Sequence, residues 1–329
     1  MAQDLQTASS VRIDDSIWER VANWVVLGGD RRAVAGCFVV AIVGVVWALI
    51  SAGVLAVGPN SSVAMIFGSG LTSGVVTLLT IALSINQLVL SRVFGSVSML
   101  TDRLKGSREL RQTVESIAEV PSSPNDPADF LSLVARTLSD RAAGLVESGD
   151  GAGWDPPARL TNALRDVAAY GDSIDDHLET NAKMNDVLRV MIGTEYARNM
   201  TAVSHLRNEY AASIPAEVLA DFQAIEDLLE SMAVIRQFYK TIAIQQDLAT
   251  LSRLLVYSGV TALVAAIVVT LVYQTNSTTL PAAMLPAVVS VGIGAVVAPL
   301  SLFVAYILRA ATVARQTISV GPFIPSRGR

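Results

Sequence analysis

Residues 33–91 read AVAGCFVVAIVGVVWALISAGVLAVGPNSSVAMIFGSGLTSGVVTLLTIALSINQLVLS and contain no charged residue and no histidine. A second stretch of this kind covers residues 254–308. A helix needs about 20 apolar residues to cross a hydrocarbon core of roughly 30 Å, so each stretch is long enough for two crossings. The whole chain is 52% hydrophobic and only 16% charged, which is too apolar for an ordinary soluble domain. We therefore predict an all-α integral membrane protein with four transmembrane helices.

Each charge-free stretch contains one turn signal, at Gly58–Ser62 in the first and at Gln274–Pro281 in the second. These turns are rich in residues that break helices or bond their own backbone, so each stretch is expected to fold as a hairpin. The four expected spans are residues 33–57, 65–90, 251–273 and 285–308.

Positive charge flanks only one end of each predicted span. Both turns are uncharged, whereas arginine or lysine occurs near the other span ends, at Arg31, Arg32, Arg92, Arg103, Lys105, Arg236, Lys240, Arg253, Arg309 and Arg315. Because positive flanks stay on the cytoplasmic side, we expect both termini and the middle domain in the cytoplasm, beneath the cell membrane. The expected organisation is an N-terminal segment, a first hairpin, a helical cytoplasmic domain, a second hairpin and a disordered tail, at residues 1–30, 31–92, 93–250, 251–309 and 310–329.

A short amphipathic helix is predicted before the first span. Ser16 and Glu19 have the spacing of a capping box. The apolar residues of the predicted helix share one face, at Ile17, Trp18, Val21, Trp24 and Val25. This face fits either the membrane interface or the protein's own cytoplasmic domain.

The middle domain is acidic and patterned as helices. Residues 93–250 hold 14 Lys and Arg against 24 Asp and Glu, which disfavours nucleic acid as a partner. Asp126 and Pro127 have the pattern of an N-cap followed by a first helical residue. The last helix is expected to run unbroken from residue 216 to 273, because apolar residues recur every three to four positions, at Val218, Phe222, Ile225, Leu229, Met232, Ile235, Tyr239 and Ile242.

The second span carries a stripe of small and polar residues. Its members recur at alternating steps of three and four, and they are Gly70, Ser73, Thr77, Thr80, Ser84, Gln87 and Ser91. Such a period keeps the stripe facing one neighbour. It fits the lining of a pore in a homo-oligomer, where hydroxyl groups replace part of an ion's hydration. For the stripe taken alone, a tight helix seam helped by Gly70 and Gly74 is the favoured interpretation.

Two further features of the spans suggest a path and a hinge. Polar residues at the inner ends of spans two and three could meet as a collar, formed by Asn86, Arg92, Gln245 and Arg253, or their side chains could instead reach the membrane interface separately. The fourth span contains Gly292, Gly294 and Pro299, which predict a kink that could serve as a gating hinge or simply as an irregular, well-packed helix.

The sequence offers little for catalysis or metal binding. Four carboxylates share one predicted helical face, at Asp172, Asp175, Asp176 and Glu179. Their spacing is not that of an EF-hand, so a solvated acidic face is the favoured interpretation and a Ca²⁺ site the weaker one. With one cysteine and two histidines in the chain, we expect neither an enzyme nor a cofactor.

Three segments carry a resemblance to known proteins, and they are Leu83–Ser91, Phe238–Thr241 and Leu251–Leu255. They resemble uncharacterised four-span membrane proteins of halophilic archaea and actinobacteria, a likeness that implies no activity. The predicted layout is also similar in topology to bestrophin-type anion channels.

Two hypotheses follow from the sequence. The first is a homo-oligomeric ion channel or pore whose second span lines the path. The alternative is a non-conducting membrane scaffold or sensor whose cytoplasmic domain binds a protein partner.

Overall fold

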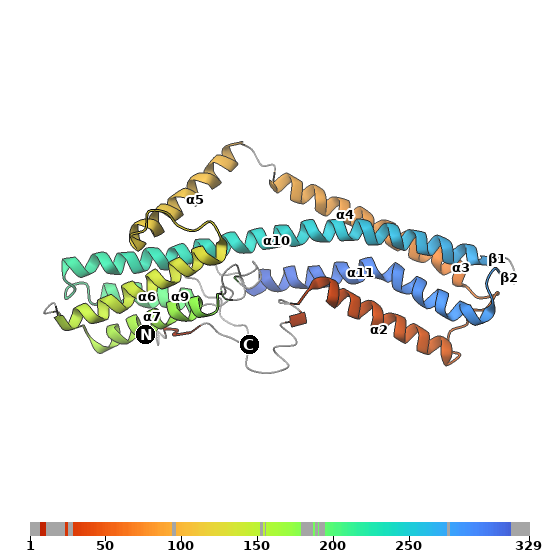
Figure 1. Cartoon of the computed structure of the whole chain (residues 1–329), viewed down its shortest axis with the longest axis horizontal. Helices are drawn as coiled ribbons and strands as arrows, with labels where there is room; N and C mark the ends of the chain where they lie inside the picture. The colour runs from red at the N-terminus through yellow and green to blue at the C-terminus, as the bar shows by residue number, and fades with distance from the viewer. Residues whose placement is uncertain are drawn as a thin grey trace. The chain divides into compact units, whose positions relative to one another are not determined.

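The computed structural model describes residues 7–10, 24–25, 29–93, 97–151, 154, 156–178, 187, 190, 195–274 and 277–316. Most of these residues are helical (Figure 1). The chain divides into two compact units. We call Met1–Arg20, Ser96–Ala243 and Val313–Arg329 the acidic unit, and Val21–Gly95 and Ile244–Thr312 the apolar unit.

The acidic unit is a helical bundle. Its described helices are α5 (Val97–Ala118), α6 (Pro127–Gly151), α7 (Ala158–Asp176), α9 (Glu195–Glu209) and the first half of α10 (Ala216–Val272). The predicted cap is confirmed, since Asp126 Oδ1 accepts a hydrogen bond of 2.8 Å from the backbone N–H of Ala128. The predicted long helix is confirmed as well, because α10 is continuous over 57 residues.

Apolar side chains of α10 lie at the centre of this bundle. The face predicted for this helix is buried, and its fully enclosed members include Phe222, Ile225, Leu229 and Met232. Trp154 contacts Phe222 edge to face, with ring centroids 6.4 Å apart. The soluble-type core of the chain therefore depends on the same helix that continues into the apolar unit.

The N-terminal segment is tied to the acidic unit by Asn199, which is fully buried. Its Oδ1 accepts from the N–H of Ala8 at 2.8 Å, and its Nδ2 donates to the carbonyl of Ala8 at 3.0 Å. Most of the predicted amphipathic helix lies outside the described residues, except Trp24 and Val25.

The apolar unit contains the helices with membrane-spanning length. Its elements are α2 (Arg31–Ser51), α3 (Val63–Met65), the π-helix η2 (Ile66–Leu71), α4 (Thr72–Val93), the second half of α10, the 3₁₀-helix η3 (Ala282–Met284) and α11 (Leu285–Gln316). In the described part of the chain, four helices are long and apolar enough to cross a membrane, within Arg31–Ser51, Val63–Leu88, Val218–Val272 and Ala282–Thr312.

Close approaches between these helices occur at glycine. A Cβ added at Gly259 of α10 would lie 2.7 Å from Leu79 Cδ2 of α4, and one at Gly294 of α11 would lie 2.5 Å from Val43 Cγ2 of α2. Ser252 adds a polar link, because its hydroxyl donates to the carbonyl of Ala82 at 3.1 Å. The unit is therefore held by small residues that let neighbouring helices touch.

The connections differ in detail from the predicted ones. Helix α2 ends at Ser51 rather than near residue 57, and Gly53 turns the chain with a φ of +73°. The second connection contains a short antiparallel pair, β1 (Tyr273–Gln274) and β2 (Ser277–Thr278), within an otherwise helical unit. The phenol of Tyr273 donates to the carbonyl of Val57 at 2.8 Å and so joins the two connections.

Candidate functional site

The stripe of small and polar residues lies on the outside of the single chain. All seven members, from Gly70 to Ser91, are exposed. The opposite side of the same helical segment carries the buried residues Phe67, Val75 and Ala82, which pack against the protein's own helices. The stripe therefore forms no seam with any helix that the structure describes in the same chain.

The hydroxyl groups of the stripe are bonded to their own helix. Thr77 Oγ1 donates to the carbonyl of Ser73 at 2.9 Å, and Thr80 Oγ1 donates to that of Val76 at 3.1 Å. Ser84 and Ser91 do the same, with distances of 3.1 and 2.9 Å. Since each hydroxyl has one hydrogen, the outward-facing part of these oxygens consists of acceptor lone pairs.

The glycines of the stripe leave open space. A Cβ added at Gly70 or Gly74 would meet no atom of the described structure within 4 Å. These positions differ from Gly259 and Gly294, which are filled by neighbouring side chains of the same chain. Space beside Gly70 and Gly74 is what a close contact with a second helix would need.

The predicted polar collar is not assembled by contacts in the described structure. Asn86 and Arg253 are exposed and Gln245 is half-buried, and no hydrogen bond or ion pair between them occurs among the described residues. The side chain of Arg92 lies outside the described part. The collar therefore stays a prediction.

A different charged cluster lies near the same ends of the helices. Arg309 Nε is 3.2 Å from Asp247 Oδ2, and the buried Arg31 interacts electrostatically with both residues. This cluster was not predicted from the sequence, although one feature of the sequence points to it. Asp247 is the only acidic residue between 231 and 329.

The three hinge candidates lie inside one continuous helix, α11. A Cβ at Gly292 would lie 2.7 Å from Val269 Cγ2, so this glycine has a packing role against α10. Pro299 lies inside the helix and is buried. Both glycines of α11 thus allow neighbouring side chains to approach the helix closely, and the hinge itself stays a prediction.

The acidic face of α7 is partly engaged by other residues. Asp175 Oδ2 accepts from Arg136 Nε at 2.7 Å, and Asp175 also accepts from the hydroxyl of Ser132. Asp172 and Asp176 are exposed, and Glu179 lies outside the described residues. Within the described ranges, no group of three or more His, Cys, Asp or Glu side chains is arranged to hold a metal ion.

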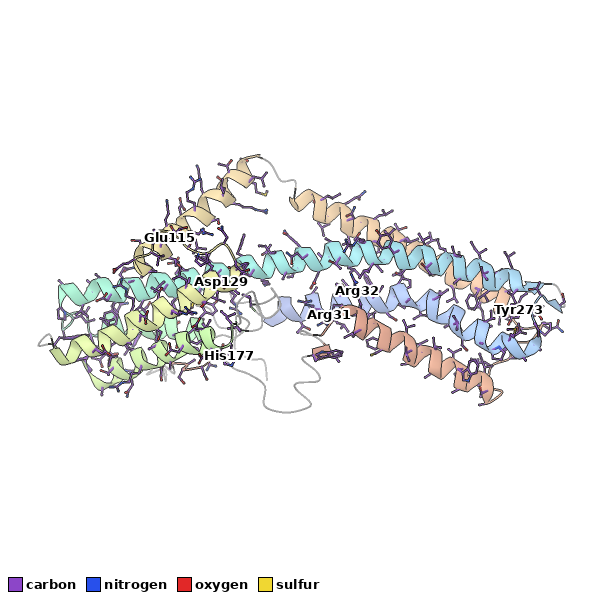
Figure 2. The ribbon with its side chains drawn as sticks, in the orientation of Figure 1. Arg31, Arg32, Glu115, Asp129, His177 and Tyr273 are labelled. Carbon is purple, nitrogen blue, oxygen red and sulfur yellow. The ribbon has the colours of Figure 1, made fainter. Side chains whose placement is uncertain are left out.

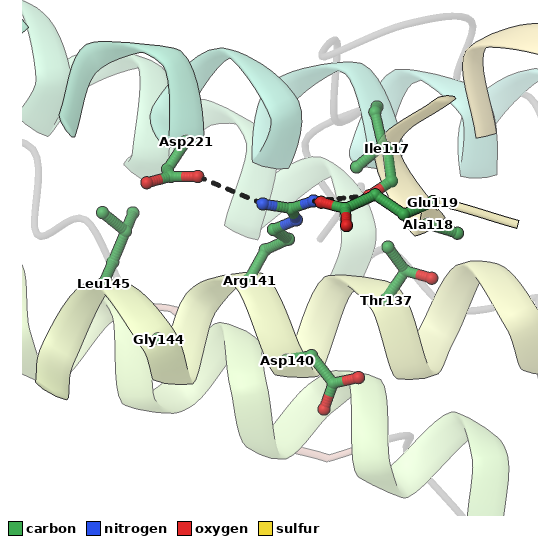
Figure 3. A pocket seen from close by; sticks show the side chains of 9 residues that line it. All are labelled: Ile117, Ala118, Glu119, Thr137, Asp140, Arg141, Gly144, Leu145 and Asp221. Carbon is green, nitrogen blue, oxygen red and sulfur yellow. Dashed lines mark hydrogen bonds and ion pairs between the residues drawn. The ribbon is translucent and has the colours of Figure 1, made fainter. Parts of the chain in front are cut away.

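An arginine lines a hollow of the acidic unit that has a volume of about 450 Å³ (Figure 3). Arg141 donates to Glu119 Oε1 at 2.8 Å and to the carbonyl of Ile117 at 2.7 Å, and it lies 3.5 Å from Asp221. Its bonds join the end of α5 to α6 and α10. These bonds hold the three helices together at the wall of the hollow.

The fold and these surfaces define a mostly helical protein with four helices of membrane-spanning character. A family model described as a family of unknown function, DUF7972, matches residues 2–328. The chain belongs to this family. No curated protein matches the chain, and no solved structure matches it. The likeness to bestrophin-type channels remains one of predicted topology.

Proposed function

We propose that the chain forms a homo-oligomeric pore, with α4 of each copy facing the path. Its four apolar helices would cross the cell membrane as two hairpins, with the acidic unit in the cytoplasm. The distribution of arginine and lysine around the charge-free stretches supports this orientation.

One observation carries the proposal, and it is the exposure of the whole stripe in the single chain. Hydroxyl and amide groups are poor partners for lipid, and such groups in spans face protein or water. Because the protein's own helices pack on the other side of α4, the stripe needs a further copy or a water-filled path.

The direction of the hydroxyl bonds favours cations in this path. Thr77, Thr80 and Ser84 donate their hydrogens to backbone carbonyls, so their lone pairs would line the pore. Lone pairs replace the hydration shell of a cation rather than that of an anion. We therefore expect K⁺ or Na⁺ to pass more readily than Cl⁻.

Flux through liposomes that contain the purified protein tests this function. We expect cation flux, and we expect Thr77→Val with Thr80→Val to reduce it about 10-fold by removing oxygens along the path. Thr261→Val is the matched control, because Thr261 is exposed on α10 and donates to the carbonyl of Tyr257 at 2.9 Å, away from the stripe. A monomeric protein without flux at any voltage or pH would refute the pore, and equal flux in all variants would remove the stripe from the path.

A second candidate, a non-conducting scaffold, is favoured by the exposure of α5. Residues 98–109 are all exposed, including Met99, Leu100 and Leu104. An isolated helical stretch of this length is only marginally stable in water, so a protein partner would stabilise it. In this case the purified protein should show no flux, and Leu100→Glu with Leu104→Glu should abolish partner binding without unfolding the acidic unit.

A further inference from the structure

Three charged residues from three helices meet in the apolar unit, at Arg31 of α2, Asp247 of α10 and Arg309 of α11. Arg309 and Asp247 form a pair, with Nε–Oδ2 and Nη1–Oδ1 distances of 3.2 and 3.4 Å. Arg31 is 3% exposed and Arg309 is 5% exposed. Asp247 pairs with Arg309 and also attracts Arg31 electrostatically, so two buried guanidinium groups are set against one carboxylate and these three residues carry one positive charge in excess.

Among the residues that the structure describes, no second buried carboxylate neutralises this excess. Asp30 is exposed, and its Oδ1 accepts from the backbone N–H of Arg32 as the N-cap of α2. Its influence on Arg31 is weaker than those of Arg309 and Asp247. A buried charge without a counter-charge is costly, so the cluster favours a further anionic partner.

The hydrogen bonds of Arg31, which is labelled in Figure 2, indicate where such a partner would bind. Its Nη1 donates to the carbonyl of Val25 at 2.6 Å. Its Nε and Nη2 are buried and have no hydrogen-bond partner among the described residues. These two N–H groups point in parallel from one edge of the guanidinium, which is the fork that binds two oxygens of one oxyanion.

The sequence places this edge at the end of the charge-free stretches. Arg31 precedes the stretch that begins at residue 33, and Arg309 follows the stretch that ends at residue 308. Phosphate groups of lipids lie at the corresponding depth of a bilayer. We propose that the free edge of Arg31, beside the Asp247–Arg309 pair, binds one phosphate group, from either a lipid headgroup or free phosphate.

Thermal unfolding of the full chain in a neutral detergent tests this site, and it does not depend on conduction. The probes are inorganic phosphate at constant ionic strength and phosphatidic acid, with diacylglycerol of the same chains as the control without phosphate. A bound probe at 100 times its Kd should raise the Tm of the natural sequence by about 5 °C. A shift with phosphatidic acid alone identifies a lipid, and a shift with both probes identifies the phosphate group itself.

Variants of Arg31 distinguish the contribution of its paired N–H groups to phosphate binding from the contribution of its charge. Arg31→Lys keeps the charge but loses the paired N–H edge, so it should weaken binding about 10-fold. Arg31→Gln should weaken binding about 100-fold and, because it removes a buried charge, should raise the Tm measured without any probe. Arg32→Gln is the matched control, since the neighbouring Arg32 is exposed and should leave binding unchanged.

Three outcomes would overturn the proposal. The first is no Tm shift of the natural sequence with either probe. The second is an equal shift in the natural sequence and in Arg31→Gln. The third is full binding by Arg31→Lys, which would leave no role for the paired N–H groups.

Discussion

The acidic unit and the apolar unit place their polar side chains in different ways. In the acidic unit, charged groups join separate helices, as in the pairs Arg136–Asp175 and Arg207–Glu226. In the apolar unit, charged groups join helices at the cluster of Asp247 and Arg309, while hydroxyl groups along the spans, such as those of Thr77 and Thr270, bond to their own helix. The acidic unit therefore depends on a large core with bridging polar groups, and the apolar unit depends on close helix contacts made by small residues.

The largest difference between the units should appear when a core ring is removed. Phe222→Ala should destabilise the acidic unit by about 3–5 kcal/mol, because it empties a fully enclosed site and removes the contact of Trp154. Denaturant unfolding followed by tryptophan fluorescence would measure the loss. Ile267→Ala, at an exposed position of α10 in the apolar unit, should change detergent stability by less than about 1 kcal/mol. Equal losses would contradict the comparison.

Glycine replacements should distinguish helix contacts in which a glycine lies against backbone atoms from those in which it lies against side chains. In Gly171→Ala of the acidic unit, the added Cβ would lie 2.5 Å from the backbone oxygen of Ala135, which cannot rotate away. We expect a cost of about 1–3 kcal/mol, and a smaller cost for Gly292→Ala, where the nearest atoms belong to side chains.

Gly106→Ala on the exposed part of α5 serves as the control for these replacements, because a Cβ there would meet nothing within 4 Å. It should stabilise the protein by about 0.5–1 kcal/mol through helix propensity. Thermal unfolding in detergent would measure all three variants. A destabilising Gly106→Ala would show that α5 is covered in the folded protein.

The end of α5 offers a smaller effect. Glu119 has a φ of +56°, a backbone conformation that favours glycine, yet its carboxylate pairs with Arg141. Glu119→Gly should stabilise the acidic unit by up to about 1 kcal/mol, because relief of the backbone outweighs an exposed ion pair. Glu119→Ala keeps the backbone conformation and loses the ion pair, so it should be less stable than the natural sequence. Guanidinium unfolding midpoints would rank the three proteins, and a Glu119→Gly below Glu119→Ala would refute this interpretation.

Acid should weaken the acidic unit through two carboxylates, Asp175 and Glu115. Burial acts to raise the pKa of Asp175, but hydrogen bonds from Arg136 and Ser132 outweigh it and hold the pKa below its ordinary value. Hydrogen bonds from the hydroxyl and the N–H of Ser123 lower the pKa of Glu115, which is labelled in Figure 2.

Because both pKa values are lower in the folded state, their stabilisation is present above about pH 4 and is lost as the pH falls through the folded values. Unfolding midpoints measured from pH 7 to pH 3 should show this loss. The double variant Asp175→Asn with Glu115→Gln should lose less stability over the same range, and parallel curves would exclude these two groups as the cause.

Much of the fold could be predicted because it depends on patterns of residues that lie close together in the sequence. Long charge-free stretches predict spanning helices, Asp126 predicts a helix start, and the apolar repeat of α10 predicts its buried face. The buried cluster could not be predicted in this way. Arg31, Asp247 and Arg309 are far apart in the sequence, and only tertiary packing brings them together.

The sequence predicts which residues form the stripe, but it does not predict what surrounds them. A period of three and four residues predicts that the stripe shares one face, whereas nothing in that period says which neighbour the face meets. The answer within one chain comes from the packing of Val75 and Ala82 on the other side of α4. The hydrogen bonds between Asn199 and Ala8 also could not be predicted from the sequence. The side chain of an asparagine can bond to many nearby backbone groups, so nothing in its sequence position indicates a partner 191 residues away.

The shared helix α10 sets an order of events during synthesis. Its first half supplies Phe222, Ile225 and Met232 to the core of the acidic unit, and its second half is an apolar helix of the other unit. The helices α5, α6, α7 and α9 leave the ribosome before the first half of α10 does, so they cannot complete their shared core until that half has been made. Synthesis of α10 thus completes the core of the acidic unit and, directly afterwards, produces the third apolar helix.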